Sequence, residues 1–284
     1  MLRTYYQLTK PGIIYGNLMT ATAGYLLAAR GVIQWRVLAA MAVGIALVMA
    51  SGCVFNNYID RDLDKAMART RQRALVTGAV SGRSALSYGA VLGLVGAAVL
   101  LAGTNWVTTL VAVAGWVVYV LMYAVGKRRS VHGTVVGSLA GAVPPLVGYL
   151  AVRGHVDAGA VIVFAALALW QMPHFYAIAI YRAKEYAAAK VPVLPLRRGV
   201  PPAKRAIVAY IMAFTIAACL LTVFRYTGYI YLAVMVLLGL EWLRRGLAGW
   251  RAPDDDRWAR GLFGFSLIVL MGFSLAMAAG PLLP

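Results

Sequence analysis

The sequence predicts an all-α polytopic integral membrane protein, a bundle of nine transmembrane helices. Of its 284 residues, 62% are hydrophobic and 13% are charged, and the mean hydropathy is +0.77. Apolar stretches recur about every 30 residues, and a helix of about 20 residues crosses the roughly 30 Å hydrocarbon core of a bilayer. The whole chain, 1–284, is therefore expected to form a single transmembrane domain without a separate soluble part.

Nine apolar stretches account for the predicted helices in chain order, and they cover residues 12–29, 37–58, 85–103, 106–125, 133–151, 158–181, 205–224, 227–243 and 262–280. No small-residue cleavage site follows the first stretch, so we expect it to be retained as a helix rather than removed as a signal peptide. The second leads directly into an acidic segment. The sixth contains Pro173, which we expect to disturb that helix and free backbone groups inside the membrane.

Basic residues predict the orientation of these helices. With nine spans, the termini lie on opposite sides, and the N-terminus shares its side with the loops after the second, fourth, sixth and eighth helices. That side carries every Lys and Arg of the chain except Arg30, Arg36, Arg153 and Arg225. Because cytoplasmic loops are enriched in Lys and Arg, we expect a cytoplasmic N-terminus and an outer C-terminus in a prokaryotic cytoplasmic (inner) membrane.

The net charge of +18 does not indicate nucleic acid binding. The charge lies in short loops between apolar spans, where topology and anionic lipid account for it. Cys53 and Cys219 fall inside predicted helices without metal-type spacing, so they are interpreted as small buried apolar residues. His132 and His155 lie near predicted helix ends, and neither is assigned a role.

A polar segment after the second span is the first candidate for chemistry. In a helical continuation of that span, Asn56, Asp60 and Asp64 share one face, with Asn57 beside them and Asp62 well round the helix. Such a stripe of oxygen atoms suits Mg²⁺, which commonly bridges carboxylates and the phosphates of a substrate. Carboxylates at a membrane boundary are also costly unless paired or metal-bound. The stripe therefore predicts a metal site.

Arginines follow this stripe at Arg69, Arg71 and Arg73. Their guanidinium groups can bind phosphate oxygens bidentately and neutralise the charge of a departing diphosphate. A solvated, salt-bridged helix end is the alternative interpretation of the segment, but it does not explain the pair of asparagines.

A second polar constellation lies in and after the sixth span. His174, Ile178, Tyr181 and Glu185 recur at helical spacing, so a histidine within the span and a carboxylate at its end could line one cavity. A lone membrane histidine is commonly a hydrogen-bonding residue in helix packing. Gln171 one turn earlier and the neighbouring proline favour a functional role here.

These residues resemble the motifs of the UbiA-type intramembrane prenyltransferases, and specifically their protohaem IX farnesyltransferase (haem O synthase) branch. In that branch an Asn, here Asn57, replaces the Asp that usually follows the first Asn. The resemblance is nearly full length, and it rests on residues 8–14, 51–64, 69–73, 133–134, 144–145, 170–174 and 258–260.

The resemblance implies transfer of a farnesyl group from farnesyl diphosphate to a vinyl group of haem b, giving haem O. Mg²⁺ would assist departure of diphosphate, leaving an allylic cation inside an apolar cavity that excludes water. Haem O would serve a terminal oxidase, directly or after hand-over to haem A synthase. Membrane lipid is the expected surrounding, and no nucleic acid is expected as a partner.

The resemblance also implies roles for individual residues. Asn56, Asp60, Asp64 and Glu185 would hold metal and diphosphate, with Asn57 and Asp62 secondary. Phosphate contacts would come from Arg69, Arg73, Arg182 and Lys184, and His174 would approach the haem. The ring faces of Tyr58, Tyr181 and Tyr186 would stabilise the cation. The second motif of the family commonly has two aspartates four residues apart, whereas this chain has Tyr181 and Glu185, which puts a separate second Mg²⁺ site in doubt.

Two alternatives remain at this point. One is a prenyltransferase with another acceptor, such as 4-hydroxybenzoate or a quinone precursor, against which Asn57 and residues 170–174 argue. The other is a carrier or channel that uses Asp60 and Asp64 as an ion site, for which the acids would need to reach the membrane midplane.

Overall fold

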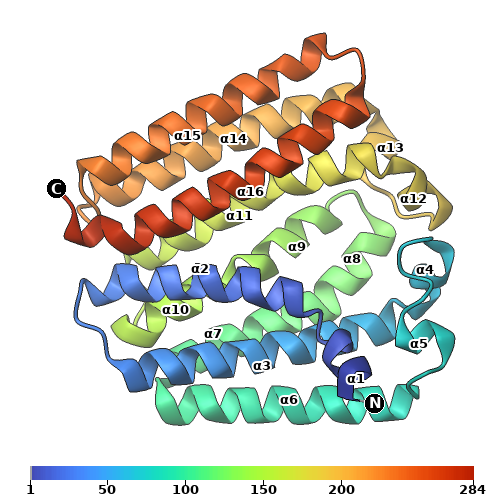
Figure 1. Ribbon diagram of the computed structural model, residues 1–284, viewed down its shortest axis with the longest axis horizontal. Helices are drawn as coiled ribbons and strands as arrows, with labels where there is room; N and C mark the ends of the chain where they lie inside the picture. Colours follow the sequence, from blue (N-terminus) through green and yellow to red (C-terminus); the bar gives the residue numbers. More distant parts are fainter. Residues whose placement is uncertain (1) are drawn as a thin grey trace.

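The computed structural model describes residues 2–284, and within that range it contains helices and no strands (Figure 1). In chain order the elements are α1 (Leu2–Leu8), α2 (Pro11–Ala29), α3 (Trp35–Ile59), α4 (Arg61–Ala66), α5 (Ala74–Thr77), α6 (Gly82–Gly103), α7 (Trp106–Val117), the π-helix η1 (Val118–Met122), α8 (Tyr123–Arg129), α9 (Gly133–Gly141), α10 (Val143–Arg153), α11 (Ala158–Tyr181), α12 (Ala183–Ala188), α13 (Leu194–Arg198), α14 (Val200–Val223), α15 (Tyr229–Ala248), the 3₁₀ turn η2 (Gly249–Arg251), α16 (Asp255–Ala279) and the 3₁₀ turn η3 (Gly280–Leu282).

Each predicted apolar stretch coincides with one helix or with two or three consecutive helices. The fourth is α7, η1 and α8 in continuous succession, and the fifth is α9 followed by α10. Seven stretches among the described residues are long and apolar enough to cross a membrane by length and composition. Helices α2 and α15 occupy the other two predicted positions, so the all-helical membrane fold is confirmed and the number nine remains a prediction.

The long helices form a ring in chain order. Helix α3 packs against α2 and α6, α11 against α14, and α15 against α14 and α16, while α16 returns to pack against α2. Figure 1 shows the two halves of this ring, with α11, α14, α15 and α16 together above α2, α3 and α6. The ring closes because its first and last long helices are neighbours.

The helix break between α9 and α10 determines how this ring is filled. Helix α9 packs against α8 and α11, whereas α10 crosses to pack tightly against α2. The approach is so close that a Cβ atom built on Gly148 would overlap the carbonyl of Ala21, and one on Gly24 would overlap that of Pro145. Proline tolerates the first turn of a helix, so Pro144 and Pro145 allow α10 to start afresh after Ala142.

Local sequence explains where several long helices begin. Ser81, Asn105, Asp157 and Asp254 precede α6, α7, α11 and α16, and the side chain of each accepts a hydrogen bond from a backbone N–H of the first turn. Pro173 lies inside α11, which nevertheless continues to Tyr181. Pro173 thus does not interrupt the helix, because packing against α14 and α16 holds it together, while the expected freeing of backbone groups by the missing amide donor stays a prediction.

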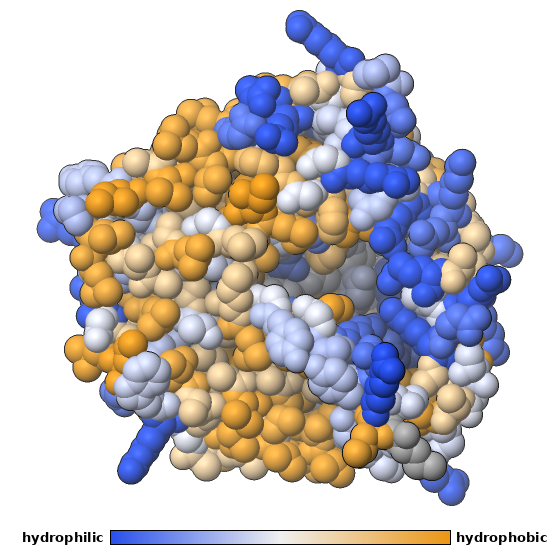
Figure 2. All heavy atoms as spheres, viewed as in Figure 1, coloured by the Kyte–Doolittle hydropathy of each residue, from blue (hydrophilic) through white to orange (hydrophobic). Residues whose placement is uncertain are grey.

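The surface separates into an apolar body and a polar end. The short helices α4, α5, α12 and α13 gather at one end of the bundle, and the chain termini lie towards opposite ends (Figure 1). Figure 2 shows hydrophilic residues concentrated at that same end and hydrophobic residues over most of the remaining face, which is hollowed beside the polar region. Large apolar side chains such as Leu94, Leu237 and Leu275 are exposed on this body, as expected for contact with lipid.

Candidate active site

A cavity of about 840 Å³ lies inside the helix ring and reaches its polar end. Polar side chains from α3, α4, α8 and α12 line the mouth, and apolar side chains from α3, α7, α11 and α16 line the deeper part. The apolar part of its lining includes Ile45, Ala112, Pro144 and Leu167. The size and mixed lining suit a ligand with a charged head and a large apolar body.

The predicted stripe of Asn56, Asp60 and Asp64 lines this cavity. Helix α3 ends at Ile59 and α4 begins at Arg61, so the two helices are not one continuous element. The helical spacing is kept nevertheless, because the Asp60 N–H donates to the Asn56 carbonyl at 2.9 Å and the Asp64 N–H donates to the Asp60 carbonyl at 2.8 Å. All three side chains are buried.

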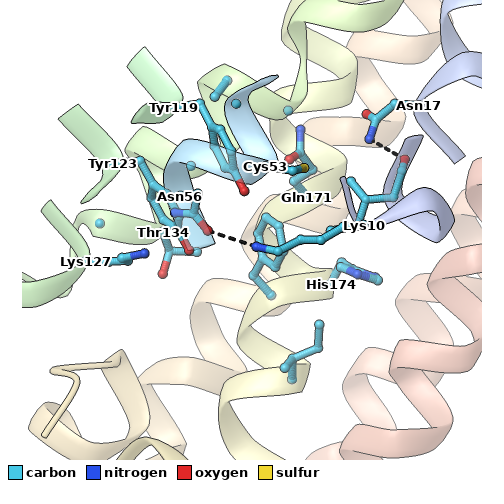
Figure 3. A pocket seen from close by; sticks show the side chains of 18 of the residues that line it. Lys10, Asn17, Cys53, Asn56, Tyr119, Tyr123, Lys127, Thr134, Gln171 and His174 are labelled. Carbon is cyan, nitrogen blue, oxygen red and sulfur yellow. Dashed lines mark hydrogen bonds between the residues drawn. The ribbon is translucent and has the colours of Figure 1, made fainter. Parts of the chain in front are cut away.

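Each member of the stripe contacts a basic residue from another element. Lys127 of α8 is paired with Asp60. Arg73 Nη1 lies 2.7 Å from Asp64 Oδ2, and Lys10 Nζ donates to Asn56 Oδ1 at 3.0 Å, as Figure 3 shows. The site therefore joins residues more than 60 positions apart in the sequence, as the 67-residue separation between Asp60 and Lys127 shows.

Lys10 reaches the cavity from the loop between α1 and α2. Its backbone has the left-handed conformation, with φ of 54°, and it directly precedes the helix that begins at Pro11. Burial lowers the pKa of the Lys10 ammonium to about 8. A half-buried cation with one neutral amide as its hydrogen-bond partner favours the arrival of an anion.

The second predicted motif faces the first across the mouth. Glu185 of α12 lines the cavity, 3.9 Å from Arg69 and 3.8 Å from Arg182. Arg69 follows α4, so this contact brings the two polar segments together. Within residues 2–284 no three His, Cys, Asp or Glu side chains gather as a metal cluster, so Glu185 stands apart from Asp60 and Asp64 in this arrangement.

Two buried polar atoms without a hydrogen bond test whether the stripe suits a metal. Asp60 Oδ1 and Asn56 Nδ2 are buried and have no hydrogen-bond partner among the described residues, and the charge nearest to Asp60 Oδ1 is the Arg128 guanidinium, 3.6 Å away. A buried carboxylate oxygen without a donor is costly, and a hard cation would satisfy it. Basic residues also outnumber acids in the lining, with Lys10, Arg69, Arg73, Lys127 and Arg182 against Asp60, Asp64 and Glu185. The donor set therefore fits Mg²⁺ together with a multiply charged anion.

Four candidate residues lie outside the described cavity lining. Asn57 is buried beneath it, where its amide donates to the Leu8 carbonyl and accepts from Arg73. The Arg61 guanidinium lies over the Tyr58 ring, 4.6 Å from its centroid. Asp62 and Lys184 are exposed. The structure thus places Asn57 as a support for Arg73, and it brings neither Tyr58, Asp62 nor Lys184 to the cavity.

His174 lies deeper in the cavity than the acidic stripe, among aromatic rings. Trp170 stacks on it with a centroid distance of 4.8 Å, and Phe263 of α16 lies at the same distance. Its Nδ1 is 2.7 Å from Ser266 Oγ. Gln171 lies one helical turn before His174. Its side-chain amide donates to the Ser138 and Leu167 carbonyls and so joins α11 to α9.

The polar lining residues that sequence reasoning missed include Lys10, Tyr119, Tyr123 and Lys127. Tyr119 and Tyr123 are stacked, with ring centroids 5.8 Å apart, and Lys127 Nζ lies 5.0 Å from the Tyr123 centroid. Lys127 belongs to a basic cluster that topology alone explained, so its charge carried no separate signal. The spacing of 119, 123 and 127 on one helical face was a signal that could have been used.

The sequence profile of the UbiA prenyltransferase family matches residues 17–278. The chain belongs to this family. It is 52% identical over 278 residues to protoheme IX farnesyltransferase 2 of Chromobacterium violaceum, covering 97% of this chain and 92% of that protein. It is 48% identical over 277 residues to protoheme IX farnesyltransferase of Protochlamydia amoebophila, covering 98% of each chain.

Solved structures of UbiA proteins share this fold. A digeranylgeranylglyceryl phosphate synthase superposes with a TM-score of 0.82 at 19% identity, covering 99% of this chain and 98% of that one. A UbiA homologue from Archaeoglobus fulgidus, bound to GPP and Mg²⁺, superposes with a TM-score of 0.71 at 15% identity, covering 97% and 99%. This UbiA prenyltransferase is therefore an enzyme of an integral membrane family, and its ring of helices is the fold of that family.

Proposed function

We propose that this UbiA prenyltransferase transfers the farnesyl group of farnesyl diphosphate to a vinyl group of protohaem IX, giving haem O and diphosphate. The observation that carries the proposal is the near 50% identity over almost the full length to proteins named protoheme IX farnesyltransferase. The cavity supports it, because a charged mouth and a long apolar interior match a diphosphate head, a prenyl chain and a macrocycle.

The basic residues of the mouth bind and orient the diphosphate in this proposal. Lys10, Arg73 and Lys127 converge there from three elements, and Arg69 and Arg182 face them beside Glu185. As the allylic C–O bond breaks, the electron pair leaves on the diphosphate, and these cations stabilise the charge that grows there. Fixed cations suit this task because they need little reorganisation during the reaction.

Mg²⁺ fits the same mouth. Asn56, Asp60 and Asp64 would hold it, with Glu185 as a further carboxylate at the opposite side, and the bound ion would neutralise diphosphate oxygens. Asp60 Oδ1, which accepts no hydrogen bond in the described residues, supports this assignment. The Mg²⁺ and GPP bound to the Archaeoglobus fulgidus homologue provide a precedent within the fold.

The apolar interior holds the farnesyl cation and the acceptor. Tyr119, Tyr123, Tyr181 and Tyr186 line the cavity, and aromatic rings can stabilise a cation through their faces without donating an electron pair to a bond. The terminal carbon of the haem vinyl group attacks the allylic cation. Water then adds to the benzylic-type carbon of the opened double bond and releases a proton, which leaves a hydroxyethylfarnesyl group.

The cellular setting follows from the same proposal. The relatives are bacterial, and the basic polar end of the bundle is the side that the positive-inside rule places in the cytoplasm. The N-terminus is then cytoplasmic and the C-terminus outside the inner membrane. The hydrophobic product passes to haem A synthase or to a terminal oxidase during assembly.

The test is a reaction in membranes that contain this protein. We expect haem b, farnesyl diphosphate and Mg²⁺ to yield a haem whose mass has increased by a farnesyl group plus a hydroxyl group, and a chelator to abolish that product. Extracted haems are separated by liquid chromatography, and their masses are determined by mass spectrometry. If haem is unchanged while 4-hydroxybenzoate or a quinone precursor is prenylated in a parallel reaction, haem is not the acceptor and the proposal is wrong.

A further inference from the structure

We propose that His174 is an axial ligand of the haem iron, bound through its Nε2 atom. The inference rests on the proposed function for the identity of the acceptor, and it adds how this chain holds the macrocycle. It comes from the hydrogen bonds around one side chain, which determine the nitrogen that carries the proton.

Ser266 determines the tautomer of His174. The Ser266 hydroxyl donates to the Phe263 carbonyl at 2.6 Å, and a serine hydroxyl has a single proton to donate. Its Oγ atom lies 2.7 Å from His174 Nδ1 and must therefore accept there. This requires a proton on Nδ1, assigned from the hydrogen-bond network, and it leaves a lone pair on Nε2.

The ring is also held in position. Trp170 stacks on it at 4.8 Å with an interplanar angle of 28°, and Phe263 lies at 4.8 Å with an angle of 38°. The Trp170 indole in turn donates to the Ser266 carbonyl at 2.9 Å. Ser266 and Phe263 of α16 and Trp170 of α11 thus fix the plane of the His174 imidazole before any ligand arrives.

Nε2 is free to bind a ligand. His174 lines the cavity, and its Nε2 has no hydrogen-bond partner among the described residues and is not one of the buried atoms without a partner, so it is accessible. A neutral imidazole whose Nδ1–H is held by an oxygen acceptor and whose Nε2 faces open space is the arrangement found for metal-binding histidines. Ligands of haem iron include histidines held in this way.

The position suits the reaction. Glu185 follows His174 by eleven residues along α11 and α12, a separation of roughly 16 Å at the rise of a helix. The iron would therefore lie in the apolar part of the cavity while an edge of the macrocycle extends towards the charged mouth. Ligation would orient the acceptor without involving the residues that bind diphosphate.

The experiment measures haem binding by purified wild-type protein and by single-residue variants, using absorption and electron paramagnetic resonance spectra of ferric haem b. We expect a histidine-ligated spectrum for the wild type and for His155→Ala, which changes an exposed histidine outside the cavity. His174→Gly should lose that spectrum, and added imidazole should restore it. Ser266→Ala should retain ligation with affinity weakened by roughly tenfold, since it removes the partner of Nδ1.

Metal-free protoporphyrin IX separates iron ligation from packing. Ligation predicts that the wild type binds haem more tightly than the metal-free ring and that His174→Gly binds both alike. A wild-type spectrum without a histidine ligand, or a thiolate spectrum lost in Cys53→Ser, would overturn the inference. If the same preparation still forms haem O, only the ligation by His174 is wrong and the proposed function is supported. A wild-type protein that neither binds nor farnesylates haem would contradict the proposed function itself.

Discussion

At the scale of single residues, the polar mouth depends on pairs of opposite charge that a substrate can rearrange. Asp60 contacts Lys127 through one oxygen, while its other oxygen has no hydrogen-bond partner in the described residues. Arg73 holds Asp64 and Asn57 at once. These contacts keep the cations close to the acids, so a metal-bound diphosphate meets both kinds of group at the same place.

Asp60→Asn is expected to lower kcat for haem O formation by about 10²-fold or more, because the amide removes the charge that a hard cation requires. Product formation in membranes is measured by mass spectrometry, and the amount of folded protein by size-exclusion chromatography in detergent. Asp256→Asn makes the same chemical change at an exposed position of α16 away from the cavity and should leave the rate unchanged. Equal rates for the two variants would show that Asp60 is not a metal ligand.

Contacts between side chains far apart in the sequence were the part of the site that sequence could not predict. The spacing of Asn56, Asp60 and Asp64 is local, so it survived the change of helix at Asp60. Lys127 and Lys10 reach the same stripe from distant segments, and their contacts depend on how the ring closes. Tyr58 was expected to serve the cation, but the short helix α4 directs Arg61 over its ring instead.

At the scale of elements, the break before α10 is what creates a cavity with a closed inner end. The sequence predicted a helix over 133–151, and the structure divides it at Ala142. Its two halves have different neighbours, since α9 stays in the wall and α10 lies against α2. Hydropathy could not reveal this division because both halves are apolar, although Pro144 and Pro145 were a signal for a new helix start.

Gly148→Ala is expected to destabilise the protein by about 1–3 kcal/mol, because the added methyl group meets the backbone carbonyl of Ala21 rather than a side chain that can move. Thermal unfolding in detergent measures the effect. Gly264→Ala is the matched control, since a Cβ atom there meets no atom within 4 Å, and its change should stay below about 1 kcal/mol. A Gly148→Ala protein as stable as the Gly264→Ala protein would contradict the close packing of α2 and α10.

At the scale of the whole molecule, composition and periodicity predicted the class of protein and the position of each long helix. The match of α11 to residues 158–181 illustrates why: a long apolar stretch bounded by Asp157 and Arg182 has one stable arrangement in lipid. The short helices at the polar end were not predicted, because they lie in charged loops where apolar periodicity is absent.

The orientation of the molecule is expected to follow its charge. Alkaline phosphatase fused after the C-terminus should be active, since that enzyme folds outside the cytoplasm, while the same enzyme fused after Arg198 should be inactive. Fusions of a fluorescent protein that folds in the cytoplasm should give the opposite pattern. Activity at both positions, or at neither, would contradict the odd number of crossings and the predicted sides.

The packing of α10 on α2 has a consequence for the cell that holds this protein. Beyond Pro144 the side chains of Val147, Tyr149 and Leu150 are almost completely buried, so the cavity ends inside the bundle. In the bacterial inner membrane proposed for this protein, energy is stored as a difference in proton concentration and voltage. A water-filled cavity open to both faces of the membrane would dissipate this gradient. A cavity closed at its inner end admits bulky substrates and leaves the gradient intact.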